Sequence, residues 1–154
     1  MQLSENFSLK EMTRSDTATR MGHANEAGST ETANLKTLCE KVLQPIRNHY
    51  GKSVKINSGF RHPDVNASVG GSKTSDHCRG MAADVEIDGI ANADLATWIS
   101  KNLKFTQIIL EFYTPGIPDS GWVHVSYDTA NLKGQTLTAM KEGGKTVYKP
   151  GFVV

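Results

Sequence analysis

The sequence of 154 residues contains only two cysteines, Cys39 and Cys78, and no apolar run near the ~20 residues that span a bilayer. Two cysteines cannot build the dense disulfide framework of a small secreted scaffold, so both are expected to be free thiols. The opening residues, MQLSENFSLKEM, lack the apolar segment of a secretory signal. These absences predict a protein that is made in a cytoplasm and does not insert into a membrane.

Neither sign of charge dominates, because 17 lysines and arginines face 16 aspartates and glutamates, for a net charge of +1. Proteins that hold nucleic acid on a basic face usually carry a clear positive excess, so no nucleic-acid partner is expected. Repeats, low-complexity tracts and linkers rich in proline or serine are also lacking. Residues 1–154 are therefore expected to form one domain, and we expect a monomer.

The positions of apolar residues predict helices in the first part of the chain. A capping-box pattern places the start of a short helix at Leu9. Apolar residues at three- and four-residue spacing predict a longer helix over about 31–49, with Pro45 kinking its last turn. Polar and small residues over 22–32 indicate a loop. Residues 62–80 indicate a second, long and structured loop, of the kind that often carries function.

Alternating apolar and polar residues predict strands in the second part of the chain, over 54–58, 83–87, 106–112 and 122–127. A last hairpin is expected to turn at Gly143-Gly144. Between the second and third strands, Asn92 is expected to cap a helix. The pattern predicts an α+β domain in which N-terminal helices pack on a small, mainly antiparallel sheet.

Side chains that bind metals interrupt this pattern on two strands and in the long loop that precedes the first of them. Strand alternation places Asp84 on the face opposite the core, and it places His124 on the corresponding face of its own strand. The imidazoles of His77 and His124 and the carboxylate of Asp84 form a donor set that suits zinc and leaves a fourth position open for water. A strand histidine is, however, often only hydrogen-bonded, and the spacing alone leaves that alternative open.

Motifs spread along the chain, in a fixed order, share a resemblance to one family. They are Phe7-Ser8-Leu9-x-Glu11, Asn34-Leu35, Val42-Leu43-x-Pro45-Ile46-Arg47, Ser58-Gly59-Phe60-Arg61, Asn66-x3-Gly70-Gly71-Ser72, Ser75-x-His77-x2-Gly80-x-Ala82-x-Asp84 and Trp122-Val123-His124. Together they resemble the zinc D-alanyl-D-alanine carboxypeptidases, peptidase family M15, and among these the phage-associated branch of peptidoglycan endolysins. The resemblance covers about residues 6–127. It implies a hedgehog/DD-peptidase-like fold and a zinc ion on His77, Asp84 and His124.

The resemblance also implies roles for two residues outside the ligand set. An arginine at the position of Arg61 faces the zinc and steadies the oxyanion at the scissile carbonyl, which suits a fixed guanidinium. The alternative is a surface arginine paired with Asp64. Ser75 is expected to orient a ligand or the substrate from behind the metal ligands, and a plain turn serine is the alternative. His62, beside Arg61, is interpreted as a loop histidine.

The sequence departs from the family at the general base. Many members carry Glu or Asp three residues before the last zinc histidine, where this chain has Gly121. Glu111 and Asp119 are the two candidate replacements. Pairing of the strands near Phe112 and Val123 would set Glu111 opposite His124, whereas aspartates in loops such as that of Asp119 usually form turns. We therefore favour Glu111 as the base, with Asp119 as the alternative.

These residues predict a zinc peptidase that hydrolyses peptide bonds of bacterial peptidoglycan, with a stem or cross-link peptide as its partner. The bond is of the D,D-carboxypeptidase or endopeptidase type, or of the L-alanyl-D-glutamate type. The expected setting is a phage endolysin that stays in the host cytoplasm until lysis and then acts on the cell wall. A virion-associated enzyme and a prophage-encoded bacterial protein are alternatives. The rival function is a catalytically silent, zinc-containing module that binds the wall or builds a virion, because Gly121 lacks a carboxylate.

Overall fold

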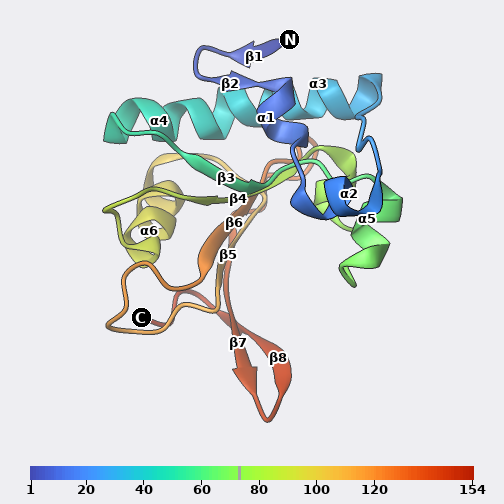
Figure 1. The fold of residues 1–154 in the computed structure, drawn as a ribbon. Helices are drawn as coiled ribbons and strands as arrows, with labels where there is room; N and C mark the ends of the chain where they lie inside the picture. The colour runs from blue at the N-terminus through green and yellow to red at the C-terminus, as the bar shows by residue number, and fades with distance from the viewer. Residues whose placement is uncertain (73) are drawn as a thin grey trace.

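A six-stranded sheet with the order β3-β4-β6-β5-β7-β8 forms the centre of the computed structural model, which describes residues 1–72 and 74–154 (Figure 1). Neighbouring strands are antiparallel except for the parallel pair β5–β7. The strands are β3 Lys55–Ser58, β4 Ala82–Glu86, β5 Gln107–Glu111, β6 Trp122–Ser126, β7 Gln135–Glu142 and β8 Lys145–Pro150. A separate pair is formed by β1 Gln2–Ser4 and β2 Phe7–Ser8. The predicted α+β class with a mainly antiparallel sheet is confirmed.

Helices precede the sheet along the chain and also connect its strands. They are α1 Leu9–Thr13, α2 Asp16–Met21, α3 Ser29–Leu38, α4 Gln44–Tyr50, α5 Pro63–Ser68 and α6 Asn92–Asn102. A π-helical turn over Cys39–Leu43 joins α3 to α4, and a 3-10 turn covers Asp76–Arg79. Within the described part of the chain, none of these helices has the length and apolar character that crossing a membrane requires. Both cysteines are free thiols, as expected.

The helix expected over 31–49 begins earlier and is irregular in its middle. The predicted start of α1 at Leu9 is correct, since Ser8 Oγ accepts a hydrogen bond from the backbone of Glu11 at 3.2 Å. In the longer helix the irregularity lies ahead of Pro45. The backbone N–H of Gln44 bonds to the carbonyl of Cys39, five residues earlier. This wider turn relieves the crowding that a proline ring imposes on the preceding helical turn.

Two predicted loops contain helices. The loop over 62–80 includes α5, which Pro63 opens at a position where its missing N–H costs nothing. The loop over 22–32 ends early, because α3 starts at Ser29. Asn92 lies in the first turn of α6, but it does not cap the helix as predicted, because Ala91 occupies the cap. The Asn92 amide instead donates to Glu86 and to the carbonyl of Ser120, which ties β4 to the loop before β6.

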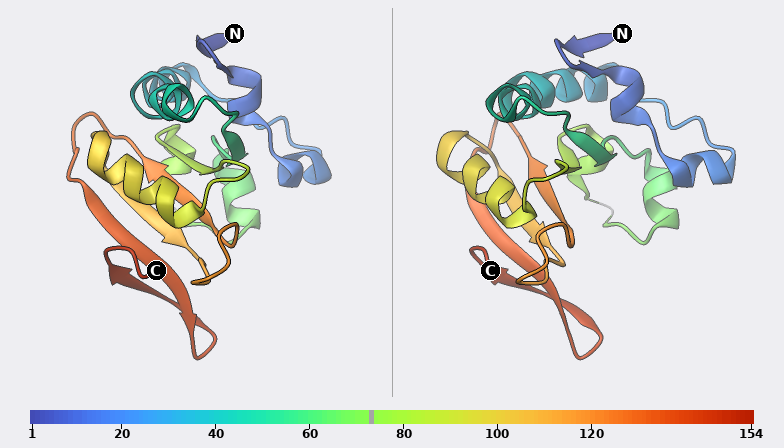
Figure 2. Two further views of the ribbon diagram at one scale, coloured as in Figure 1. Left: turned by 90° about the vertical axis from the view of Figure 1, so that its left-hand side faces the viewer. Right: turned by 60° about the vertical axis from the view of Figure 1, so that its left-hand side comes forward.

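The two faces of the sheet differ in what covers them. The core face carries fully buried apolar side chains and packs on α6, which contacts β5 and β6. In the turned views α6 lies on one side of the sheet, and α2 and α5 lie on the other (Figure 2). The buried core-face residues are Ala83, Val85, Ile108, Leu110, Val123 and Val125. The opposite face carries Asp84, His124 and Glu111, so the strands position these side chains on the side of α2 and α5.

Candidate active site

His77, Asp84 and His124 form a tight group on the open face of the sheet. Asp84 and His124 are directly paired across β4 and β6, and their side chains meet with Nδ1 of His124 3.1 Å from Oδ1 of Asp84. Nε2 of His77 lies 3.4 Å from the same oxygen. One donor atom from each of the three residues lies within 4.8 Å of the other two. Two imidazoles and one carboxylate at this spacing are able to hold a metal ion.

The hydrogen bonds around His77 agree with a role in metal binding. Its Nδ1 lies 2.8 Å from the carbonyl oxygen of Gly59, an acceptor, so Nδ1 carries the proton and donates it. This leaves the lone pair of Nε2 free on the side of Asp84 and His124. Metal-ligating histidines commonly donate their second N–H to a backbone carbonyl in this way. The residues present therefore fit a zinc ion.

Asp84 and His124 shift the pKa values of one another in favour of their charged forms. Burial acts to raise the pKa of Asp84, but the charges and hydrogen bonds of His77 and His124 outweigh it and hold that pKa well below its usual range. Burial acts to lower the pKa of His124, but the hydrogen bond and the charge of Asp84 raise it above the usual value. Asp84 is thus an ionised carboxylate, which is the form that binds a metal.

Close packing of the backbone places His77. A Cβ on Gly59 would overlap the carbonyl oxygen of Met12, whose carbonyl also accepts from the N–H of Phe60 at 2.8 Å. Only glycine lets the end of β3 approach α1 this closely, and this approach fixes the carbonyl that His77 contacts. Ser75 Oγ accepts from the backbone N–H of His77 at 3.2 Å. Ser75 therefore shapes the turn that presents His77, and it also lines the cleft described below.

Arg61 lines the same cleft and is held by Asn66 rather than by Asp64. Nη1 of Arg61 donates to Oδ1 of Asn66 at 3.2 Å, and the Asn66 amide donates to the carbonyl of Ser72 at 2.8 Å. Asn66 is buried. The carboxylate of Asp64 instead lies near two histidines, each 3.6 Å away. Arg61 is therefore a cleft residue held by a neutral amide. Asn66 fixes its position and does not neutralise its positive charge.

Glu111 lies beside the metal-binding group, although the predicted strand register is wrong by two residues. Glu111 pairs with Trp122, and Ile109 occupies the place opposite His124. Because side chains alternate with a period of two, this shift keeps Glu111 on the face of His124. Burial, followed by the negative charge of Asp84, raises the pKa of Glu111, whereas His124, Trp122 and Arg61 act to lower it. The result is a half-buried carboxyl group with a raised pKa, the property expected of a general base.

Asp119 and Gly121 lie in the loop between β5 and β6. Asp119 is exposed and does not line the cleft that holds Glu111. Gly121 adopts the left-handed conformation with φ +64°, and a Cβ there would overlap the carbonyl oxygen of Glu111. No side chain fits at this position, so the loop of this chain cannot supply a carboxylate three residues before His124.

A cleft of about 820 Å³ connects these side chains. Arg14 and Arg20, near the two ends of α2, line one wall, and the polar residues Ser72 and Ser75 line another. The sheet forms the floor, where Ile109, Glu111, Trp122 and Tyr148 join the metal-binding group. The cleft therefore presents an ionised donor set, a carboxyl group and a guanidinium to one space.

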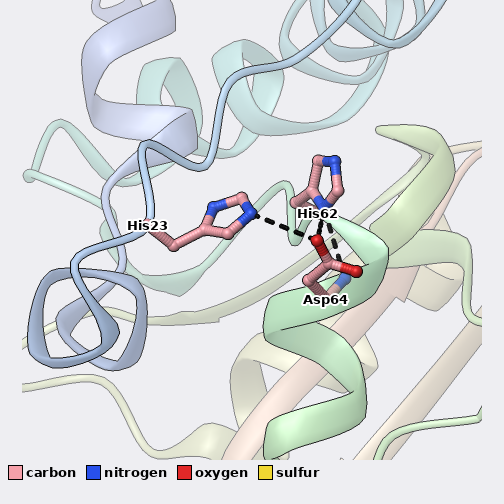
Figure 3. Close-up of side chains that lie close together, drawn as sticks. All are labelled: His23, His62 and Asp64. Carbon is pink, nitrogen blue, oxygen red and sulfur yellow. Dashed lines mark hydrogen bonds and ion pairs between the residues drawn. The ribbon is translucent and has the colours of Figure 1, made fainter.

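His23, His62 and Asp64 form a second group with two histidines and an aspartate (Figure 3). Its hydrogen bonds are the reverse of those around His77. Nδ1 of His23 accepts from the backbone of Asn25 at 2.8 Å, and Nδ1 of His62 accepts from the backbone of Asp64 at 3.2 Å. Neutral His23 therefore carries its proton on Nε2, the atom that faces Asp64 at 3.6 Å. Asp64 is exposed and the group lies outside the cleft, so it forms a contact between the α2–α3 loop and α5.

Comparison with known proteins identifies the family of the chain. A family model described as peptidase M15 matches residues 5–126, which contain every residue of the candidate site except Tyr148. The chain belongs to the peptidase M15 family. The zinc D-Ala-D-Ala carboxypeptidase of Streptomyces albus G is 33% identical to this M15 peptidase over 114 residues, which are 73% of the chain and 42% of the relative. The chain thus spans less than half the length of that relative.

Two residues of this M15 peptidase, Asn66 and Tyr148, gain their place at the cleft from contacts that the sequence does not signal. Asn66 is buried, and it is the contact that holds the guanidinium of Arg61. Tyr148 lies on the last hairpin, which reaches the cleft through the parallel pairing of β5 with β7. Strand pairing between segments far apart in sequence leaves no local signal.

Proposed function

We propose that this M15 peptidase hydrolyses peptide bonds of bacterial peptidoglycan with a zinc ion held by His77, Asp84 and His124. The observation that carries the proposal is the arrangement of His77. Its Nδ1 donates to the carbonyl of Gly59, while its Nε2 faces the carboxylate oxygen of Asp84 that His124 also contacts. The relative from Streptomyces albus G, whose name specifies zinc and D-Ala-D-Ala, supports the choice of metal and of substrate class.

When bound, zinc supplies a water of lowered pKa and polarises the carbonyl group of the substrate. Glu111 is the residue that takes a proton from the attacking water and delivers it to the amine that leaves. Its raised pKa brings it nearer to the pH at which it works, which is the condition for an efficient general base. Glu111 is proposed in preference to Asp119, which is exposed and lies outside the cleft.

Arg61 donates hydrogen bonds to the oxygen that gains negative charge when the carbonyl is attacked. A guanidinium held in place by Asn66 loses little rotational freedom during the reaction, so its charge acts at full effect. Ser75 acts indirectly, since it fixes the backbone turn that carries His77. These roles account for the site residues without a side chain at position 121.

A phage endolysin is the setting that we propose, with the enzyme in the host cytoplasm before lysis and the cell wall as its target. The motifs that resemble the phage-associated branch support this setting. The rival function, a silent module that binds the wall or builds a virion, rested on the missing carboxylate at position 121. Glu111 in the cleft favours the enzyme, because it supplies a carboxylate from the neighbouring strand.

Digestion of purified peptidoglycan tests the proposal. The zinc-loaded protein should release soluble wall fragments, and mass spectrometry of these fragments identifies the bond. The Glu111→Ala variant should release no fragments and should still bind one equivalent of zinc. A wild-type protein that binds zinc and the wall, yet releases nothing from walls of several cross-link types, would instead support the silent module.

A further inference from the structure

The β7–β8 hairpin extends the cleft beyond the catalytic side chains. The match to the M15 family ends at residue 126, whereas β7 and β8 cover 135–150. The hairpin projects from the sheet on the side away from α3 and α4 (Figure 1). Its side chains are therefore features of this chain that the family match does not include.

One row of side chains runs across four strands from the general base to this hairpin. Glu111 pairs with Trp122 on β6 and with Ala139 on β7, and Ala139 pairs with Tyr148 on β8. Directly paired residues share a face of the sheet, so Tyr148 lies on the same face as Glu111. Ala139, which lies between them in the row, is small and fully buried. Tyr148 lines the same cleft as Glu111 and is 56% exposed.

The spacing of strands sets which part of a substrate reaches Tyr148. Neighbouring strands lie ~4.8 Å apart, so two steps separate the backbones of Glu111 and Tyr148 by about 10 Å. An extended peptide advances ~3.3–3.6 Å per residue. These spacings place the tyrosine ring beside the substrate residue that is about three positions from the scissile bond, when that bond lies beside Glu111.

The ring of Tyr148 offers an apolar surface beside a lysine on the same face of the hairpin. On the cleft face of the hairpin, the ammonium of Lys141 is held by Thr146 Oγ1 at 3.0 Å and lies 5.6 Å from the centre of the Phe112 ring. Lys149 and Glu142, which pair at 2.8 Å, belong to the opposite face because they alternate with Tyr148 and Ala139. An exposed tyrosine ring offers a flat apolar surface with one hydroxyl group.

We propose that Tyr148 is a specificity-determining residue, which contacts the segment of the peptidoglycan peptide about three residues from the scissile bond, a reach set by the strand spacing. This rests on the proposed function. It implies that the enzyme distinguishes long wall peptides from short ones that carry the same scissile bond. The reaction at the bond itself does not depend on Tyr148.

Kinetics with synthetic wall peptides of two to five residues, all of which carry the scissile bond, test this. Tyr148→Ala should raise KM for the five-residue peptide by about 2- to 10-fold, the range for loss of one aromatic contact. It should leave kcat and the rates on the dipeptide unchanged. Tyr148→Phe keeps the ring and should behave as the wild type. Ile117→Ala removes an apolar side chain of similar exposure, 51%, outside the cleft, and is the matched control.

Binding supplies a second readout that does not require turnover. In a Glu111→Gln background, Tyr148→Ala should weaken the affinity for the five-residue peptide and leave zinc content unchanged. Equal effects of Tyr148→Ala on the dipeptide and the five-residue peptide, or no effect on either, would overturn the specificity role and leave the proposed function intact. Failure of the proposed function looks different, because the wild type would then cleave none of the peptides.

Discussion

Gly121 lies so close to the backbone of Glu111 that any Cβ at position 121 would overlap the Glu111 carbonyl oxygen. The contact leaves no room for the carboxylate that, by the resemblance, many members of the family carry three residues before the last zinc histidine. Glycine at position 121 lets the loop pack closely against the end of β5. That end carries Glu111, so the carboxylate enters the cleft from a neighbouring strand instead.

Gly121→Ala should therefore disturb the base more than it disturbs the fold. A left-handed conformation at a residue with a side chain costs of order 1–3 kcal/mol, and the overlap displaces the end of β5 as well. Turnover on peptidoglycan should fall at least tenfold, in line with loss of a positioned acid–base group. Gly134→Ala is the control, since φ is +65° there and nothing lies within 4 Å of the added Cβ. Equal activity of the two variants would show that the contact does not position Glu111.

Metal content separates the two groups of histidines and aspartate. The wild type should hold one tightly bound zinc per chain, measured by mass spectrometry of the dialysed protein. Asp84→Ala should lose that zinc, because it removes the ionised ligand that both histidines face. His62→Ala should keep it, because His62 lies outside the cleft and its acidic neighbour Asp64 is exposed. Two equivalents of zinc, one of them lost in His62→Ala, would contradict this assignment.

Much of the site followed from the sequence, because its ligands obey local rules. Alternation along two strands was enough to bring Asp84 and His124 to one face, and their direct pairing agrees with it. The relation of Glu111 to His124 was harder to predict, because the register depends on how the loop over 112–121 closes. Phe112 and Gly121, at the two ends of this loop, both take left-handed conformations, and Glu111 pairs with Trp122, two residues from its predicted partner. Sequence patterns do not report such backbone contacts.

Arg61→Lys should keep the fold and the zinc but lose most turnover. An ammonium cannot reproduce the two-pronged donation of a guanidinium, and loss of one oxyanion donor costs ~10²–10³ in rate. Asn66→Ala should lower kcat in the same direction by a smaller factor, because Arg61 would keep its charge and lose its fixed position. Arg47→Lys on α4, outside the cleft, serves as the control. If Arg61→Lys loses no more than about threefold in activity, far less than the expected ~10²–10³, Arg61 takes no part in the reaction.

Thiol reactivity tests the packing beneath α3 and α4. Burial, together with the charges of Glu11 and Glu40, raises the pKa of Cys39 to about 12. The thiolate is the reactive form, so Cys39 should not react at neutral pH while the protein is folded. Cys78 is partly exposed, and its pKa is also raised by burial, so it should react slowly. After treatment of the folded protein with iodoacetamide, peptide mapping should find label on Cys78 alone. After treatment of the denatured protein, it should find label on both thiols.

The last prediction concerns the base. Glu111→Gln should keep the fold and one zinc per chain, because the amide is nearly isosteric and Glu111 is not a ligand. Turnover should fall by ~10²–10⁴, the usual contribution of a positioned acid–base group. Asp119→Asn is the matched control and should change little, since Asp119 is exposed and lies outside the cleft. If Asp119→Asn is inactive and Glu111→Gln is active, Asp119 and not Glu111 is the general base.

The pH profile of the same variants gives an independent reading. Burial and the charge of Asp84 raise the pKa of Glu111, so the carboxyl group stays protonated to a higher pH than an ordinary glutamate. A protonated carboxyl group cannot accept a proton, and kcat/KM should fall as the pH drops through this pKa. A bound zinc ion acts in the opposite direction, because its positive charge favours the carboxylate. The decisive observation is therefore the loss of the acidic limb in Glu111→Gln, at unchanged zinc content, while Asp119→Asn retains it.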